Sequence, residues 1–281
     1  MKDNIVFRTT KDKIFKVFIT FFTFLSGIPL FVILYYIAKN GISSVNWQFL
    51  TSLPKPAGEV GGGISNAIVG TIILIFISCI FSIPLGIFTG IYLSENRKGK
   101  FPYIIRICVE VLQGVPSIVI GIIAYLWVVV PMKSPSAFSG GIALSIMMLP
   151  IIVRTTEETL KLIPYTLKEA SLALGVPYFK TILKVILPAG VSGITTGILL
   201  SISRIAGETA PLLFTAFGNE FMNFNIFKPV NSLPHLIFKY ATSPYSEWIS
   251  LAWGAAFVLA ILVLSLNLIA KLVAKKWKVQ F

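Results

Sequence analysis

Two opposite charges lie four residues apart in a segment that otherwise has the composition of a membrane span. Arg204 and Glu208 stand in the stretch RIAGETAPLL, and no other charge occurs between Lys184 and Glu220. A charge at the centre of a bilayer costs about 2.5 to 3.5 kcal/mol even on lenient insertion scales. A guanidinium stays charged at any relevant pH and can hold an oxyanion through two parallel hydrogen bonds. The pair therefore predicts either an anion-handling position inside a bundle or a structural salt bridge.

One face of a helix would position these charges. Gly197, Ser201, Arg204 and Glu208 recur at spacings of four, three and four residues, which places them on the same side of a helix. The remainder of that helix is mainly Ile, Leu and Ala, so we expect the polar face to point into a bundle and not at lipid. Pro211 is expected to bend the helix just beyond the pair.

The composition of the whole chain is that of a polytopic membrane protein. Of its 281 residues, 56% are hydrophobic and 12% are charged, and the mean hydropathy is +0.86. Crossing a bilayer takes roughly 20 apolar residues in a helix. The sequence predicts an all-α protein with six transmembrane helices, at about 17–38, 66–93, 104–131, 138–153, 189–217 and 247–270. Gly114 and Pro116 interrupt the third of them.

The net charge of +13 gathers at the ends of these spans. Most Lys and Arg residues lie in the amino-terminal segment, the turn at 97–106, the region 154–188 and the tail. Because basic residues collect on the cytoplasmic side of membrane proteins, both termini are predicted to be cytoplasmic. The basic residues do not alternate with stacking aromatics as in a nucleic-acid groove.

The first apolar run, at about 17–38, is too long for a signal-peptide core, so we expect a retained helix.

Other reactive residues give no catalytic pattern. Cys79 and Cys108 fall in or near apolar segments without metal-ligand spacing, and the single His235 is interpreted as a helix start or surface contact. Arg106 and Glu110, four residues apart near the cytoplasmic end of the third span, are interpreted as a membrane-boundary pair. The P-loop pattern GxxxxGK[ST], whose backbone cradles nucleotide phosphates, does not occur.

The second span carries a small-residue stripe at every fourth position, which favours close helix packing. Its members are Asn66, Gly70, Leu74, Ser78, Ser82, Gly86 and Gly90.

The region 154–188 is too polar to cross a membrane and too long for a plain connection. Its glycine and prolines predict two short helices: YTLKEASLAL, closed by Gly175, and YFKTILKVIL, closed by Pro188. Such a protrusion between spans suggests a docking surface.

The stretch EASLALGVPYFKTILKVILP within this region resembles the signature loop of ABC importer permeases. The residues in register are Glu169, Ala170, Gly175, Leu187 and Pro188. Ser171 and Val185 are mild departures from the pattern. The resemblance implies the type I permease fold, with a coupling helix that docks on a cytoplasmic ATPase and with these five residues at the coupling site.

Three further stretches closely resemble the phosphate-specific permeases of the PstA type. They are GVPSIVIG from Gly114, LPIIVRTTEETLK from Leu149, and RIAGETAPLL. The resemblance implies a permease domain at 64–270, preceded by an amino-terminal segment, first helix and outer loop at 1–63 and followed by a basic tail at 271–281. It places Arg204, with Glu208 and Ser201, in the path of inorganic phosphate.

The same resemblance implies the rest of an importer in a bacterial cell membrane. The partners would be a sister permease of the PstC type, an ATPase dimer of the PstB type that holds the ATP and Mg, and an extracytoplasmic phosphate-binding protein of the PstS type.

Three alternatives to this function stay open. The same architecture could carry molybdate, sulfate or another small solute. A secondary transporter would need ion-coupling carboxylates, for which only Glu208 is a candidate. A membrane enzyme would need a catalytic constellation that the sequence does not supply.

Overall fold

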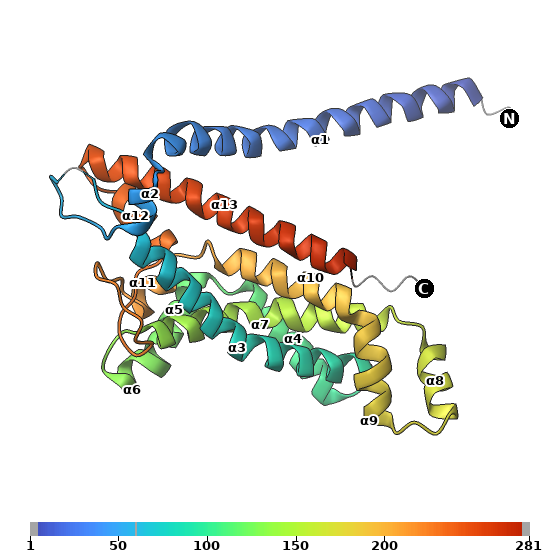
Figure 1. The fold of residues 1–281 in the computed structure, drawn as a ribbon. Helices are drawn as coiled ribbons and strands as arrows, with labels where there is room; N and C mark the ends of the chain where they lie inside the picture. The colour runs from blue at the N-terminus through green and yellow to red at the C-terminus, as the bar shows by residue number, and fades with distance from the viewer. Residues whose placement is uncertain (1–4, 60, 277–281) are drawn as a thin grey trace.

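The computed structural model describes residues 5–59 and 61–276, and within them the backbone is helical apart from loops and one isolated bridge between Phe217 and Val230 (Figure 1). The helices are α1 (Ile5–Gly41), η1 (Ile42–Ser44), α2 (Trp47–Thr51), α3 (Ser65–Glu95), α4 (Lys100–Gly114), α5 (Ser117–Ala124), η2 (Tyr125–Val129), α6 (Val130–Met132), α7 (Ala137–Lys161), α8 (Tyr165–Ala173), α9 (Tyr178–Thr181), η3 (Ile182–Ile186), α10 (Leu187–Ile205), α11 (Leu212–Thr215), α12 (Leu233–Ala241) and α13 (Ser246–Lys276). Residues 277–281 of the predicted basic tail lie outside the described part.

Five of these helical segments are long and apolar enough to cross a membrane, or six if a broken pair counts as one span. The broken pair is the predicted third span, in which α4 and the helix from Ser117 to Met132 meet at 108°. Val115 is extended (φ −69°, ψ 129°), as expected of a residue before proline. Gly114 and Pro116 therefore produce a sharp break and not a mere interruption.

Helix α7 forms the centre of the bundle, between α3 and α10. It continues to Lys161, eight residues past the predicted end of the fourth span. The small-residue stripe of α3 is buried along its whole length, which confirms the packing prediction. A methyl group on Gly86 would lie 2.6 Å from Ile152 Cγ2, and one on Gly90 would lie 2.5 Å from Thr156 Cβ. The glycines thus let the two backbones approach closely.

A second core lies where α12 and α2 pack against α13. It includes Phe49, Ile64, Leu233 and Tyr240, each at most 3% exposed. Ser232 caps α12, and its Oγ accepts a hydrogen bond from the backbone N–H of His235. His235 therefore does mark a helix start, as predicted.

The molecule has two ends, which we name by their helices. The α8 end carries α8 and α9, and the α12 end carries α2, α6, α11 and α12 (Figure 1). Helix α1 contacts α13 near the α12 end and then separates from the bundle. None of its most apolar window is buried inside the molecule.

Candidate functional site

Arg204 lies in the last turn of α10, and that helix ends one residue later at Ile205. Glu208 belongs to the turn that follows, where its N–H donates to the Ile205 carbonyl (3.1 Å). The prediction of one helix from 189 to 217 is therefore wrong, because Gly207 and Pro211 follow in quick succession and the chain unwinds between them. No ion pair joins Arg204 to Glu208 among the residues that the structure describes.

The small polar face predicted for this helix is divided by the structure. Ser201 is fully buried, and its Oγ donates to the Ile198 carbonyl (2.6 Å). A methyl group on Gly197 would lie 2.0 Å from Thr155 Oγ1 of α7. Arg204, by contrast, is exposed on the surface of this single chain. Gly197 and Ser201 thus form a packing surface toward the bundle, and Arg204 lies off that surface.

The chain unwinds directly after Arg204. The turn after α10 packs on α5, where a methyl group on Gly121 would lie 2.7 Å from Pro211 Cα. The neighbouring break between α4 and α5 is the sharp one described above. Ser203 Oγ, near the end of α10, donates to Asn267 Oδ1 in the second half of α13 (2.9 Å). Helix α10 therefore ends well short of the α12 end, as Figure 1 shows. Non-helical backbone at membrane depth is tolerated where it is buried in protein or lines a water-filled cavity.

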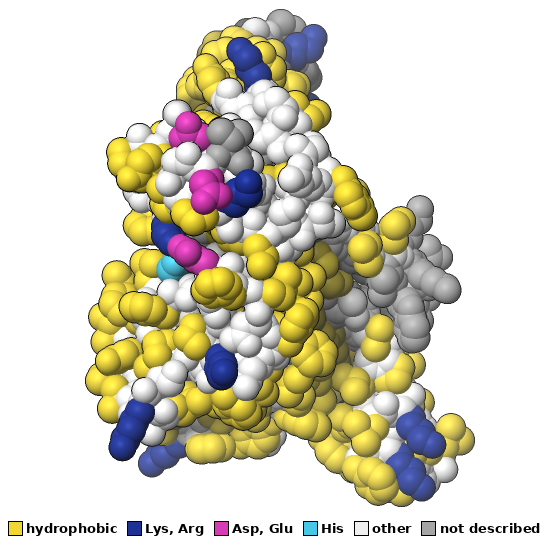
Figure 2. Space-filling view, turned by 60° about the vertical axis from the view of Figure 1, so that its left-hand side comes forward, with side chains coloured by type: hydrophobic (Ala, Val, Ile, Leu, Met, Phe, Trp, Pro, Cys, Tyr) yellow, Lys and Arg dark blue, Asp and Glu magenta, His cyan; other side chains and the backbone are white. Residues whose placement is uncertain are grey.

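The α12 end presents many apolar side chains. Figure 2 brings this end forward and shows hydrophobic side chains over much of it, with only scattered charges. The loop 217–230 contributes Phe217, Phe221, Phe224 and Phe227, each more than half exposed. Its course is fixed by asparagine side chains, such as Asn219, whose Oδ1 accepts from the Phe221 N–H (3.0 Å).

The α8 end carries the loop that resembles the importer signature. Helix α8 ends at Ala173 and reverses at Gly175, whose φ of +76° favours glycine. The first of the two short helices predicted for region 154–188, closed by Gly175, is thus confirmed. Glu169, Ala170 and Gly175 are all exposed on this hairpin. Ser171 and Thr181 are buried and share a hydrogen bond (2.9 Å) between their hydroxyls, which joins α8 to α9.

The second short helix of that region does not end at Pro188. Helical backbone runs from Tyr178 through to Ile205, with Leu187 half-buried and Pro188 exposed in the first turn of α10. The π-helical turn Ile182–Ile186 lies directly before the proline. A wider turn changes the hydrogen-bond register, so the missing N–H of Pro188 redirects the helix without ending it. Figure 1 shows α9 turning away from the direction of α10.

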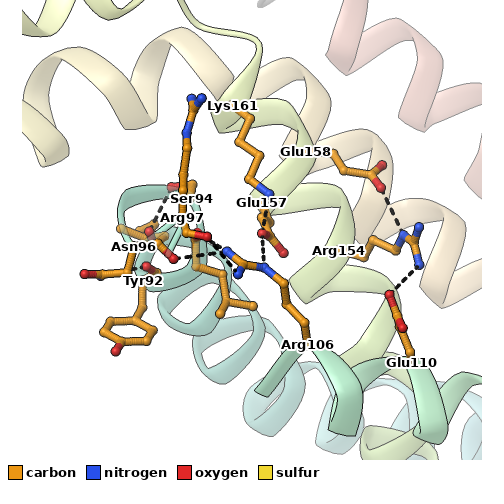
Figure 3. Close-up of polar contacts among 12 residues, drawn as sticks. Tyr92, Ser94, Asn96, Arg97, Arg106, Glu110, Arg154, Glu157, Glu158 and Lys161 are labelled. Carbon is orange, nitrogen blue, oxygen red and sulfur yellow. Dashed lines mark hydrogen bonds and ion pairs between the residues drawn. The ribbon is translucent and has the colours of Figure 1, made fainter. Parts of the chain in front are cut away.

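A charge clamp near the α8 end joins three helices (Figure 3). Arg106 of α4 donates from Nε to Glu157 Oε1 of α7 (2.8 Å) and from Nη2 to the carbonyl of Leu93 (2.8 Å) near the end of α3. The same guanidinium also reaches the carbonyls of Asn96 and Arg97. It therefore satisfies carbonyls that the end of α3 leaves without helical partners. The Glu157 side chain is only 8% exposed.

The expected pair between Arg106 and Glu110 is wrong. Glu110 instead lies 4.0 Å from Arg154, which pairs more closely with Glu158 (2.9 Å). Both of these contacts are well exposed, unlike the clamp. The partners of Arg106 and Glu110 come from α7, about 50 residues further along the chain. The spacing of residues within one helix gives no signal for such contacts.

This chain is similar to known transport proteins. The family described as "Binding-protein-dependent transport system inner membrane component" matches residues 82–279. A "Phosphate transport system permease protein PstA" of Yersinia pestis is 43% identical over 247 residues, which cover 88% of this chain and 84% of that protein. A PstA protein of Xylella fastidiosa (strain 9a5c) is 42% identical over 235 residues, which cover 83% of this chain and 82% of that one. The chain belongs to the PstA family of binding-protein-dependent transport permeases.

Solved structures place this chain in the ABC importer permease fold. A chain of the MetNI methionine ABC transporter, from a structure of its inward-facing conformations, has a TM-score of 0.61 at 18% identity and covers 76% of this chain and 94% of its own. A chain of a bacterial alginate ABC transporter has a TM-score of 0.70 at 12% identity and covers 98% of this chain and 99% of its own. At such identities the likeness is one of fold.

The remaining reactive residues of the chain do not assemble into a site within the described residues. Cys79 is half-buried in α3 and Cys108 is exposed on α4, both as free thiols. Within residues 5–59 and 61–276, no three His, Cys, Asp or Glu side chains are placed to hold a metal ion. Sequence reasoning missed the polar residues that join the α8 end to the bundle, namely Glu95, Glu157 and Lys168, because their partners are distant in sequence.

Proposed function

We propose that this chain is the membrane-spanning permease subunit of an ATP-driven phosphate importer. Its PstA relatives are named as phosphate transport permeases. The observation that carries the proposal is Arg204, an exposed guanidinium with no carboxylate partner among the described residues, directly before an unwound turn that packs on α5. Its planar fork matches two oxygens of a phosphate ion. One such group holds the ion without trapping it.

Glu208 and Ser201 have supporting roles in this proposal. Glu208 lies in the turn after Arg204, where it would orient the guanidinium and balance part of its charge when the pathway is empty. Ser201 supports α10 from its buried side. The open surface around Arg204 would face the sister permease, of the PstC type, and the two subunits would enclose the pathway together.

The α8–α9 hairpin is proposed to dock on the cytoplasmic ATPase. Leu162 is 85% exposed, Leu174 84% and Phe179 61%, which is apolar surface that water does not favour. Glu169 and Ala170 lie on the same hairpin, Gly175 forms its turn, and Leu187 with Pro188 begins the helix that leads back into the bundle. The PstB-type ATPase dimer would hold ATP and Mg, so this subunit would transport without hydrolysing ATP itself.

The orientation follows from the basic residues. Both termini and residues 154–188 are proposed to face the cytoplasm, and the α12 end would then meet a PstS-type phosphate-binding protein outside the bacterial inner or plasma membrane. Residues 64–270 would be the permease domain, behind the amino-terminal helix and loop at 1–63.

Uptake by the complex reconstituted in liposomes tests the substrate. Labelled phosphate should enter only with ATP inside and binding protein outside, and a hundredfold excess of sulfate or molybdate should leave the rate unchanged. Uptake that sulfate or molybdate abolishes would show that the permease serves another oxyanion. Uptake driven by an ion gradient without ATP would indicate a secondary transporter.

A further inference from the structure

A cation in the signature hairpin is held in a polar and aromatic cluster at the end of α3. Lys168 of α8 donates from Nζ to Glu95, the last residue of α3, and to the hydroxyl of Tyr178 (3.2 Å). The Tyr178 hydroxyl also donates to Glu95. The Lys168 ammonium lies over the ring of Tyr178 (4.7 Å) and that of Tyr165 (5.5 Å). The Lys168 side chain is 13% exposed and that of Glu95 is 18% exposed.

The ion pair between Lys168 and Glu95 is largely shielded from water. Exposed ion pairs contribute little because water competes for both partners, whereas shielded pairs hold a fixed geometry. Burial lowers the pKa of Lys168, but the hydrogen bonds to Glu95 and Tyr178 outweigh that effect, and the pKa is raised overall. Lys168 therefore stays charged throughout the physiological range.

The hairpin behind the cluster is a compact unit. The buried hydrogen bond between Ser171 and Thr181 joins its two helices, and Gly175 closes the turn between them. The chain connects it to α7 and α10, and Ile182 and Ile186, directly after α9, pack in an apolar cluster with Leu160 of α7. Lys168 and Tyr178 add a side-chain link to a third helix, α3.

Helix α3 extends this link along the bundle. Its 31 residues span about 46 Å at 1.5 Å per residue. At the α12 end, Asn66 Nδ2 donates to the carbonyls of Asn219 (2.7 Å) and Glu220 (3.1 Å) in the loop 217–230. Thr71 Oγ1 accepts a hydrogen bond from the N–H of Leu233 (2.9 Å), at the start of α12. One helix thus carries hydrogen-bonded contacts to the signature hairpin and to the phenylalanine-bearing loop (Figure 1).

We propose that Lys168, Glu95 and Tyr178 are positioning residues that transmit movement of the α8–α9 hairpin through α3 to the loop 217–230. The inference rests on the proposed function, since the movement would come from an ATPase docked on the hairpin. A movement of α8 displaces Glu95 because the ion pair is shielded, and α3 then shifts the asparagine contacts at its other end. Coupling of this kind requires an element whose position both sites change.

The test compares variants of the whole reconstituted complex. The variants are Lys168→Met, Glu95→Gln, the charge exchange Lys168→Glu with Glu95→Lys, and Tyr178→Phe, which removes only a hydroxyl. Lys98→Met is the matched control, since Lys98 is exposed three residues beyond Glu95, outside the hairpin, without a carboxylate partner among the described residues. Each sample is measured for ATPase co-purification, ATP hydrolysis and phosphate uptake.

We expect Lys168→Met and Glu95→Gln to retain the ATPase but to lower phosphate transported per ATP by at least tenfold. Tyr178→Phe should lower it about threefold, the charge exchange should recover most of it, and Lys98→Met should leave it unchanged. A second readout is the labelling rate of a cysteine at Phe221, which is 75% exposed in the loop. Trapping ATP in the ATPase should change that rate in the otherwise unaltered complex and not in Lys168→Met.

Two results would overturn the proposal. One is an unchanged transport ratio in both Lys168→Met and Tyr178→Phe. The other is a loss of uptake that matches the loss of bound ATPase, because the cluster would then only maintain the docking surface. If the unaltered complex moves no phosphate, the proposed function fails instead, whereas normal phosphate uptake with an unaffected ratio refutes the transmission alone.

Discussion

Replacing Arg106 by Met should destabilise the permease far more than the same change at Arg154. Methionine keeps an apolar stem of similar length and removes the guanidinium. At Arg106 the change breaks hydrogen bonds of 2.8 Å to Glu157, 2.8 Å to the Leu93 carbonyl and 3.1 Å to the Asn96 carbonyl. Arg154 is the matched control, because it lies near the same end and also contacts two carboxylates.

The burial of the partners sets the magnitude. A hydrogen bond to a charged group contributes about 1.5 to 3 kcal/mol, but such contributions are not additive. Arg106 is 25% exposed, so water replaces part of what is lost, and Glu157 keeps Lys161 as a partner. We therefore expect a loss of about 2 to 4 kcal/mol in the free energy of unfolding. Arg154 and its partners are 49% to 64% exposed, so the control should lose less than about 1 kcal/mol.

Unfolding in mixed micelles at increasing SDS fraction measures both variants against the unaltered chain. The double variant Arg106→Met with Glu157→Gln should recover part of the loss, because it removes the carboxylate left without its guanidinium. Equal losses at Arg106 and Arg154 would refute the reasoning, since burial would then have no influence on these contacts.

Three further predictions follow from other parts of the molecule. Arg204→Ala should abolish phosphate uptake in a normally assembled complex, Arg204→Lys should weaken uptake, and Glu208→Gln should have a milder effect. Recovery of uptake in the double variant Arg204→Ala with Glu208→Ala would show that the pair is a structural bridge instead. Gly175→Val should insert normally but lose ATPase co-purification, since a φ of +76° costs a side chain roughly 1 kcal/mol or more; a normal yield of bound ATPase would contradict this. Burial, and then the charge of Lys239, lower the pKa of His235, so the unfolded chain binds the proton more readily. Stability should be complete above about pH 6.5 and fall below it, and thermal unfolding from pH 5 to 8 should show a smaller slope in His235→Gln.

Local signals predicted the parts of the fold that depend on local chemistry. The turn at Gly175 follows from a glycine after a helical pattern, and the packing of α3 follows from its four-residue spacing. The failures arise where local signals compete. Pro188 was expected to end a helix, but the π-helical turn before it absorbs the change of register. The span predicted to reach residue 217 ends at Ile205, where two helix breakers follow within six residues.

The site was predicted less completely because its contacts are non-local. Arg204 stood out from the sequence, since a charge in an apolar segment is conspicuous, but its exposure beside a buried Ser201 depends on which helices pack against α10. The spacing of Arg106 and Glu110 suggested a pair within one helix, whereas the crossing of α4 and α7 supplies a more deeply buried carboxylate. Lys168 gave no signal, because Glu95 lies 73 residues away and only the folded hairpin brings them together.

The attachment of α1 has a consequence for how the chain is made. Its main long partner, α13, lies far along the chain, and about 200 residues separate the end of α1 from the start of α13. At roughly 5 to 20 residues per second, the ribosome takes about 10 to 40 s to supply that partner. During this interval α1 resides in the lipid without its tertiary contacts. Its orientation must therefore be established by its flanking lysines and arginine before α13 is available to pack against it.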